Sequence, residues 1–204
     1  MVDTVLRHIA VAAAAYVIGS VPFAFIWTLV FKRRDLRRLG TGNITVYNSF
    51  KNAGWAPAAM TVVSNAGLGF GVVVFSRWMA PGSDLSLLVA LVCVTVGANW
   101  PVWLAFSGGK GTTTMGWTML FIAPQAVFAV LGVWFAVLVV TRRTFTSSTV
   151  VYRTLPIILG LVTQSWRFAV AGLVLSVVLH MNHNTRKDDS LHYHLGGWFG
   201  VNRT

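Results

Sequence analysis

The chain has 204 residues, of which 55% are hydrophobic and only 10% are charged, and its formal net charge is +11. Because a soluble domain carries about 25% charged residues, this composition excludes an ordinary soluble protein and predicts an all-α, multi-span integral membrane protein. The single cysteine, Cys93, excludes an intramolecular disulfide. The excess of basic residues lies at the ends of apolar stretches, where it fits cytoplasmic loops and anionic lipid rather than nucleic acid.

The first apolar stretch, residues 8–31, is long enough to span a bilayer. The sequence Gly19-Ser20-Val21-Pro22 interrupts it and predicts a kink. The densest basic cluster of the chain follows at residues 32–38. By the positive-inside rule this loop is cytoplasmic, which places the N-terminus outside the cell.

Residues 39–51 form a segment that is rich in hydrogen-bond donors and contains no acidic residue. It contains two glycines, two threonines, two asparagines and a lysine. An acid-free set of this kind favours an anionic ligand, although an ordinary polar loop would have a similar composition.

Two further spans, residues 53–75 and 85–106, lead to a second donor-rich segment. We call residues 106–114 (Phe-Ser-Gly-Gly-Lys-Gly-Thr-Thr-Thr) the glycine hinge. Gly108, Gly109 and Gly111 allow backbone N–H groups to approach a ligand, and a following helix adds the positive end of its dipole. With the charge of Lys110, this pattern predicts a phosphate site, although it lacks the spacing of a Walker loop. A plain turn at the membrane edge is the alternative.

Pro124 decides the path of the second half of the chain. A break there predicts one short helix over residues 112–122 and a second over residues 125–140, so that Arg142 and Arg143 are cytoplasmic. A short span that ends near residue 162 and a last span that ends near residue 179 complete a bundle of about seven transmembrane helices. The whole chain is then one membrane domain, residues 1–204, with a polar cytoplasmic tail from about residue 183.

Arg153 falls well inside the sixth span. Its side chain either snorkels, so that its charged end reaches the lipid headgroups, or points into the bundle as a functional cation.

Motifs along nearly the whole chain occur in the order and spacing of one family. They are Gly19-Ser20-Val21-Pro22-Phe23, Gly40-Thr41-Gly42-Asn43 with Asn48, Trp100-Pro101 with Phe106 and Gly108-Gly109-Lys110-Gly111, Thr141-Arg142 with Ser147-Ser148, and His180 with Arg186. They resemble the bacterial acyl-phosphate:glycerol-3-phosphate acyltransferases of the PlsY type. The resemblance implies a seven-helix bundle in the bacterial plasma membrane with its site facing the cytoplasm. It also implies acyl transfer from acyl phosphate to glycerol 3-phosphate, giving lysophosphatidic acid without a metal or another cofactor.

The chain departs from the family pattern at several positions. The family's serine, arginine and histidine are replaced by Thr41, Lys51 and Ala98. The basic residue before the glycine pair is Ser107, and the asparagine of the last motif is His183. An intramembrane acid and lysine correspond to Asn65 and Leu68.

These observations give the predicted site. Lys110 and the amides of the glycine hinge would hold one phosphate, whereas Thr41, Asn43 and Lys51 would bind the other substrate, with Asn48 beside them. His180 and Arg186 would close the site, with His180 as a proton shuttle or only an interfacial cap. Arg153 would face the central cleft and supply the charge that the departures remove. We therefore expect Lys110, His180 and Thr41 to be catalytic, and the remaining residues of the set to bind substrate.

Other patterns in the tail are weaker evidence of function. His183 and Asp188 have the H-x-x-x-x-D spacing of the coenzyme-A-dependent acyltransferases, but no companion motif accompanies them. The spacing of His183, His192 and His194 is loose for a metal site. A second hypothesis for the whole chain is a non-catalytic relative, or a membrane protein that handles lipids or anions on the same scaffold.

Overall fold

The computed structural model describes residues 2–185 and contains no strand within them. Its helices are α1 (Val2–Gly19), α2 (Phe23–Lys32), α3 (Val46–Ala53), α4 (Trp55–Met79), α5 (Asp84–Asn99), α6 (Thr112–Ile122), α7 (Pro124–Thr141), α8 (Thr144–Thr163) and α9 (Trp166–Thr185). Two short 3₁₀ turns, η1 (Leu36–Arg38) and η2 (Val102–Leu104), lie between them.

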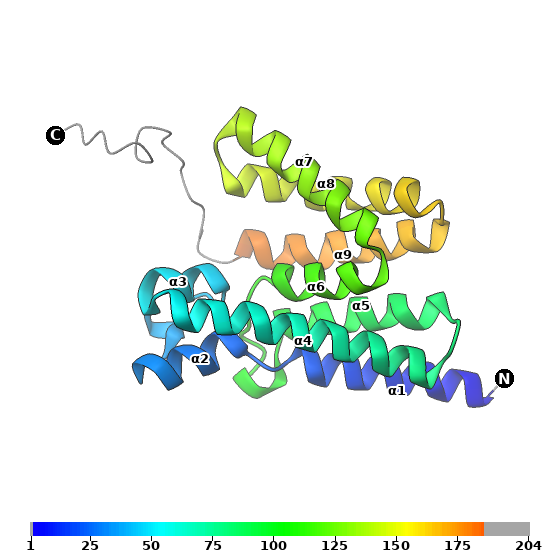
Figure 1. Ribbon diagram of the computed structural model, residues 1–204, viewed down its shortest axis with the longest axis horizontal. Helices are drawn as coiled ribbons and strands as arrows, with labels where there is room; N and C mark the ends of the chain where they lie inside the picture. Colours follow the sequence, from blue (N-terminus) through cyan, green and yellow to red (C-terminus); the bar gives the residue numbers. More distant parts are fainter. Residues whose placement is uncertain (1, 186–204) are drawn as a thin grey trace.

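The long helices run back and forth between two ends of the molecule (Figure 1). If α1 and α2 are counted as one broken span, seven apolar segments alternate in direction among the described residues, as the sequence predicts. The end of α2, the loop between α7 and α8, and the C-terminal end of α9 lie at the end opposite the N-terminus (Figure 1). The basic residues 32–38 and the Arg142–Arg143 pair therefore share one end of the bundle.

Both predicted breaks are confirmed. The first helix ends at Gly19, and the Ser20 hydroxyl donates to the Tyr16 carbonyl at 2.7 Å, before α2 begins at Phe23. Pro124 is the first residue of α7. The N–H at this position makes no hydrogen bond within a helix, so proline is tolerated there. The chain therefore turns at Pro124 instead of continuing as one long helix.

Three predicted boundaries are wrong. The first helix begins at Val2 rather than near residue 8. The next span is predicted from residue 53, but residues 46–53 form the separate helix α3 and α4 begins at Trp55. Thr45 caps the N-terminus of α3 by accepting a hydrogen bond from the Asn48 N–H. The sixth span, α8, begins at Thr144, so it is a full-length helix rather than a short one.

The described helices have the length and surface of a multi-pass membrane protein. Five segments are long and apolar enough to cross a bilayer, namely residues 2–32, 55–79, 84–104, 124–141 and 144–163, and residues 166–182 form a shorter apolar helix. Large apolar side chains such as Val63, Val140 and Leu161 are more than 60% exposed, which suits contact with lipid rather than with water.

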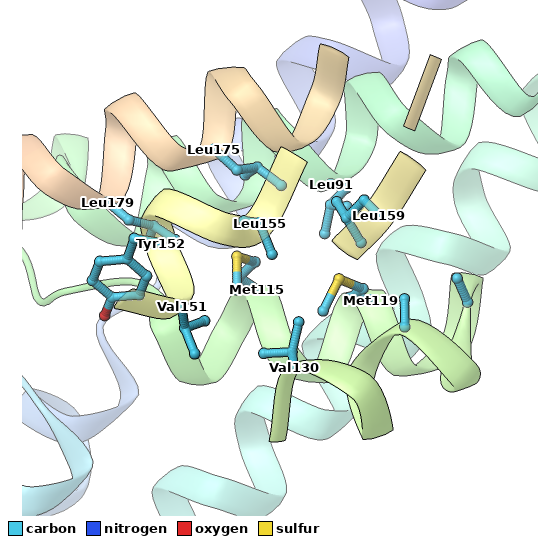
Figure 2. Packing of buried hydrophobic residues seen from close by; sticks show 12 residues of the cluster. Leu91, Met115, Met119, Val130, Val151, Tyr152, Leu155, Leu159, Leu175 and Leu179 are labelled. Atoms are coloured by element: carbon cyan, nitrogen blue, oxygen red, sulfur yellow. The ribbon is translucent and has the colours of Figure 1, made fainter. Parts of the chain in front are cut away.

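The largest hydrophobic core joins α6 and α7 to α8 and α9. Figure 2 shows Met115 and Met119 of α6 facing Leu155 and Leu159 of α8, with Leu175 of α9 beside them. In the other half of the bundle, α1 crosses α5 so closely that a Cβ on Gly97 would overlap with the Tyr16 carbonyl. The start of α6 lies against α5, because a Cβ on Gly111 would overlap with the Asn99 side chain.

Candidate active site

A cavity of about 60 Å³ opens where the break between α1 and α2 meets α4, α5 and the glycine hinge. A cavity of this volume has room for several water-sized groups. Its lining comprises Gly19, Ser20, Val21, Pro22, Phe23, Ala24, Ile44, Thr45, Val46, Thr61, Asn65, Ala98, Pro101, Gly108, Gly109, Lys110, Gly111, Thr112, Thr113 and Thr114. Both donor-rich segments predicted from the sequence contribute to it.

The glycine hinge presents the start of α6 to this cavity. Gly111 precedes α6 in the left-handed conformation, with φ of 69°, and no side chain caps the helix. The Thr112–Thr114 turn, which carries the first amides of the helix, lines the cavity. Uncapped first-turn amides and the positive end of the helix dipole attract an anion, and Lys110 adds a full positive charge.

Gly109 brings the first donor-rich segment against the glycine hinge. A Cβ at this position would overlap with the Ile44 carbonyl, so only glycine permits the approach. The Gly109 N–H also donates to the Ala98 carbonyl at 3.1 Å, which fixes the hinge to the end of α5. The two segments that the sequence predicts on one side of the membrane are therefore in direct contact.

Asn48 organises the loop that precedes α3. Its buried carboxamide donates to the carbonyls of Leu39 at 3.0 Å and Asn43 at 2.8 Å, and it accepts from the Thr41 N–H at 3.4 Å. These hydrogen bonds connect the loop to α3, so Asn48 stabilises the loop. Its predicted contact with substrate stays a prediction.

Two more hollows adjoin the cavity. One, of about 390 Å³, is lined by Thr45, Val46, Tyr47, Phe50, Lys110, Thr112 and Thr113. The other is an apolar groove of about 370 Å³ that is lined by Val21, Pro22, Phe25, Ile26, Trp103 and Leu104. Lys110 belongs to both the cavity and the first hollow, whereas Val21 and Pro22 belong to both the cavity and the apolar groove.

The other predicted site residues lie at different distances from the cavity. Thr41 and the buried Asn43 lie in the loop beside it but do not line it. Lys51 is exposed on α3. Arg153 is exposed on α8 and does not line the cavity, so its predicted inward position is not observed. Arg186 lies outside the described residues.

His180 approaches the site indirectly. Its ring packs edge-on against Tyr152, with the ring centroids 5.9 Å apart, and its Nδ1 lies 3.2 Å from the Ser176 carbonyl. The Tyr152 hydroxyl in turn hydrogen-bonds to the side chain of Thr112 at the start of α6. His180 thus contacts the cavity wall through Tyr152.

The sequence analysis missed the residue that joins α9 to the glycine hinge. The buried Asn182 carboxamide donates to the Asn99 carbonyl at 3.3 Å and to the Gly109 carbonyl at 3.1 Å. These partners are 83 and 73 residues away in sequence, so no local pattern could have revealed the contact. The side chain of Asn99 itself is fully buried behind Gly111, with no hydrogen-bond partner among the described residues.

We expect Asn182→Ala to loosen the glycine hinge. The substitution removes two hydrogen bonds to backbone carbonyls, each worth about 0.5–1.5 kcal/mol, and it frees Gly109 from α9. Turnover should fall roughly tenfold, and Asn182→Asp, which has no N–H to donate, should be at least as poor. Thermal unfolding together with kcat measures this effect.

Thr163→Val is the matched control, because it removes a 2.7 Å hydrogen bond from the neighbouring helix α8 at the far end of the bundle. It should lower the melting temperature without slowing turnover. Equal kcat in Asn182→Ala and the native protein would show that Asn182 does not position the hinge.

The charge around the site is positive. No acidic residue lines the cavity or the two hollows within the described chain. In the nearby basic segment Arg37 pairs with Asp35 at 2.7 Å, and this contact holds the pKa of that carboxyl below its usual value. Residues 2–185 contain no group of three or more His, Cys, Asp or Glu side chains that could hold a metal ion.

The fold and the cavity define a class: a multi-pass, all-helical membrane protein whose cavity is lined by Lys110 and polar groups, with no acidic side chain among the described lining residues. Residues 9–190 match the family model described as glycerol-3-phosphate acyltransferase, and the chain belongs to this family. The predicted resemblance is confirmed, and the chain is a membrane glycerol-3-phosphate acyltransferase. The non-catalytic alternative is not favoured, because the curated relatives below are named as enzymes.

Relatives agree with this assignment, and a solved structure shares the fold. The chain is 27% identical to the glycerol-3-phosphate acyltransferase of Syntrophomonas wolfei, over 90% of this chain and 93% of the relative. It is 32% identical to that of Cereibacter sphaeroides, over 88% of this chain and 84% of the relative. The fold is similar to the crystal structure of PlsY, an integral membrane glycerol 3-phosphate acyltransferase, in its glycerol 3-phosphate form. The TM-score is 0.75 at 20% identity, with 87% of this chain and 88% of that chain covered.

Two departures from the family pattern lie in the cavity wall. Asn65 and Ala98 both line the cavity, on α4 and α5. The wall at these two positions therefore carries a neutral carboxamide and a methyl group, with no ionisable side chain at either.

Proposed function

We propose that this enzyme transfers a fatty acyl group from acyl phosphate to glycerol 3-phosphate, at a site that faces the cytoplasm of a bacterial cell. One observation carries the proposal: Lys110 and the uncapped start of α6 line both the cavity and the adjoining larger hollow, and neither has an acidic side chain in its lining. Two phosphate-bearing substrates need such an arrangement, because their mutual repulsion has to be offset while they are held together.

The proposed reaction needs no protein nucleophile. A hydroxyl oxygen of glycerol 3-phosphate attacks the carbonyl carbon of acyl phosphate, and the bond from that carbon to the phosphate oxygen breaks. Inorganic phosphate leaves with the electron pair, and the hydroxyl proton passes to a phosphate oxygen or through a side chain such as His180. Lys110 and the α6 amides stabilise the negative charge that grows on the leaving phosphate.

The shapes of the three hollows suggest where each part of the substrates lies. The cavity and the larger hollow share Lys110 and the start of α6, so together they suit the phosphate groups of the two substrates. The apolar groove between α2 and η2 reaches the cavity at Val21 and Pro22. It has the surface that an acyl chain requires, because burial of methylene groups stabilises a bound lipid by about 0.8 kcal/mol each.

The remaining predicted residues are proposed in supporting positions. Thr41 and Asn43 lie in the loop that Asn48 holds beside the cavity, from which a small shift would bring them to a substrate. Lys51 and Arg153 are exposed and would attract the anionic substrates to this end of the bundle. Arg186 is proposed to close the site together with His180.

A donor comparison tests the proposed function. Purified protein in detergent is given labelled glycerol 3-phosphate with either acyl phosphate or acyl-coenzyme A of the same chain length. Labelled lysophosphatidic acid should form with acyl phosphate and not with acyl-coenzyme A. Product from acyl-coenzyme A alone would contradict the proposed donor.

The proposed orientation places the N-terminus outside the cell and the loop between α7 and α8 inside. In a Cys93→Ser background, Trp78→Cys at the end of α4 and Arg143→Cys before α8 lie at opposite ends of the bundle. We expect an impermeant thiol reagent to label only residue 78 in intact cells, and both residues after permeabilisation. Labelling of residue 143 in intact cells would refute this orientation.

A further inference from the structure

The wall of the cavity contains a buried polar side chain that has no hydrogen-bond partner among the described residues. Asn65 is 92% buried by its neighbours, with 8% of its surface exposed. Its carboxamide lines the cavity and makes no hydrogen bond within the described part of the chain. A buried amide that makes no hydrogen bond costs the free energy of its lost hydration. A polar group of a ligand inside the cavity would offset this cost.

The neighbours of Asn65 are also polar and uncharged. Ser20 and Thr61 line the same cavity, and each hydroxyl donates within its own segment, to the Tyr16 and Pro57 carbonyls at 2.7 Å. Their oxygens keep lone pairs that can accept a hydrogen bond, whereas the Asn65 carboxamide can both donate and accept. A neutral hydroxyl group fits this set, because it can donate and accept at once.

The groups that line the cavity are of two kinds. Lys110 and the start of α6 contribute positive charge, whereas Ser20, Thr61 and Asn65 contribute neutral polar groups. Asn65 follows Trp55 by ten residues on α4, so it lies about 15 Å along the axis from the start of that helix. A ligand with a phosphate at one end and hydroxyl groups at the other matches this division.

We propose that Asn65 determines acceptor specificity by hydrogen-bonding the hydroxyl of glycerol 3-phosphate that is not acylated, the one at C2. This inference rests on the proposed function. The primary hydroxyl has to reach the donor carbonyl at the mouth of the apolar groove, near Val21 and Pro22. The C2 hydroxyl, one carbon nearer the phosphate, is then the group left to meet the neutral polar groups.

Paired acceptors test the inference. Glycerol 3-phosphate is compared with 3-hydroxypropyl phosphate, which keeps the primary hydroxyl and the phosphate but lacks the C2 hydroxyl. The native enzyme should prefer glycerol 3-phosphate in kcat/KM by roughly 3- to 10-fold, the factor that corresponds to one neutral hydrogen bond. A native enzyme that uses both acceptors equally well would overturn the inference without involving any variant.

Substitutions at Asn65 test whether this residue is the source of the preference. In Asn65→Leu and Asn65→Ala the KM for glycerol 3-phosphate should rise, with little change for 3-hydroxypropyl phosphate, so that the preference disappears. A variant that loses activity equally on both acceptors would assign Asn65 a structural role and overturn the inference. Ser76→Ala is the matched control, because it removes a buried hydroxyl of the same helix, bonded to Ser86 at 2.9 Å, outside the cavity. It should keep the native preference.

Failure of the role proposed for Asn65 can be distinguished from failure of the proposed function. If the native enzyme forms no lysophosphatidic acid from acyl phosphate, the proposed reaction fails. If it forms the product without any preference between the two acceptors, only the role of Asn65 fails.

Discussion

Lys110→Met should reduce kcat/KM for acyl transfer by roughly 100-fold while the protein remains folded. Lys110 belongs to the walls of both the cavity and the larger adjoining hollow, so its charge acts on both anionic substrates. One charge-assisted hydrogen bond to a phosphate is worth about 1.5–3 kcal/mol, which corresponds to a factor of about 10 to 100. Methionine keeps the length of the stem and removes the charge, so steady-state kinetics on purified protein measures the contribution of the charge.

Lys32→Met is the control for a general loss of positive charge. Lys32 is exposed at the end of α2 and does not line any of the three hollows. This variant should retain native kinetics. Unchanged kinetics in Lys110→Met would remove Lys110 from the site.

Gly109→Ala should have an effect of similar size through the backbone. The added methyl group would overlap with the Ile44 carbonyl, so the glycine hinge and the loop before α3 would have to separate. Overpacking of this kind destabilises a protein by typically 1–3 kcal/mol, and it moves Lys110 away from Thr45 and Val46. We expect a loss of about 100-fold in kcat, because small displacements of positioning groups reduce rates by this factor.

Gly116→Ala is the matched control within the same segment. A Cβ at Gly116 of α6 would meet no atom within 4 Å, and alanine favours a helix by about 0.5–1 kcal/mol over glycine. This variant should be as active as the native enzyme and slightly more stable. Native turnover in Gly109→Ala would show that the contact with Ile44 is not needed.

The sequence predicted those features that depend on local chemistry. The break at Gly19–Pro22 and the turn at Pro124 follow from the backbone limits of proline and appear where expected. The start of α6 at Thr112 follows from the glycine hinge. The family resemblance rested on such local motifs, and it was confirmed.

Features that depend on tertiary contact could not be predicted in this way. Asn182 and the glycine hinge are more than 70 residues apart in sequence. Asn65 is a single polar residue in an apolar helix, and its significance is visible only where α1, α4, α5 and α6 converge. The inward position expected for Arg153 depended on which face of α8 packs against α9, and the core face carries Tyr152, Leu155 and Leu159 instead.

α3 shows why a short amphipathic helix escapes a search for spans. Its eight residues, Val46–Ala53, have no apolar run, so the segment resembles a polar loop. Its helix depends on the Thr45 cap and on the packing of Ser49 beneath it, where the Ser49 hydroxyl lies 2.9 Å from that of Thr28. A search for capping residues would have found the first of these two contacts.

The most direct test of the account measures both products of one reaction. Purified native enzyme is incubated with acyl phosphate and glycerol 3-phosphate, and inorganic phosphate and lysophosphatidic acid are quantified over the same time course. The account predicts one phosphate released for each lysophosphatidic acid formed, and neither product at a significant rate with Lys110→Met. Phosphate release without lysophosphatidic acid, or formation of lysophosphatidic acid without phosphate release, would contradict it.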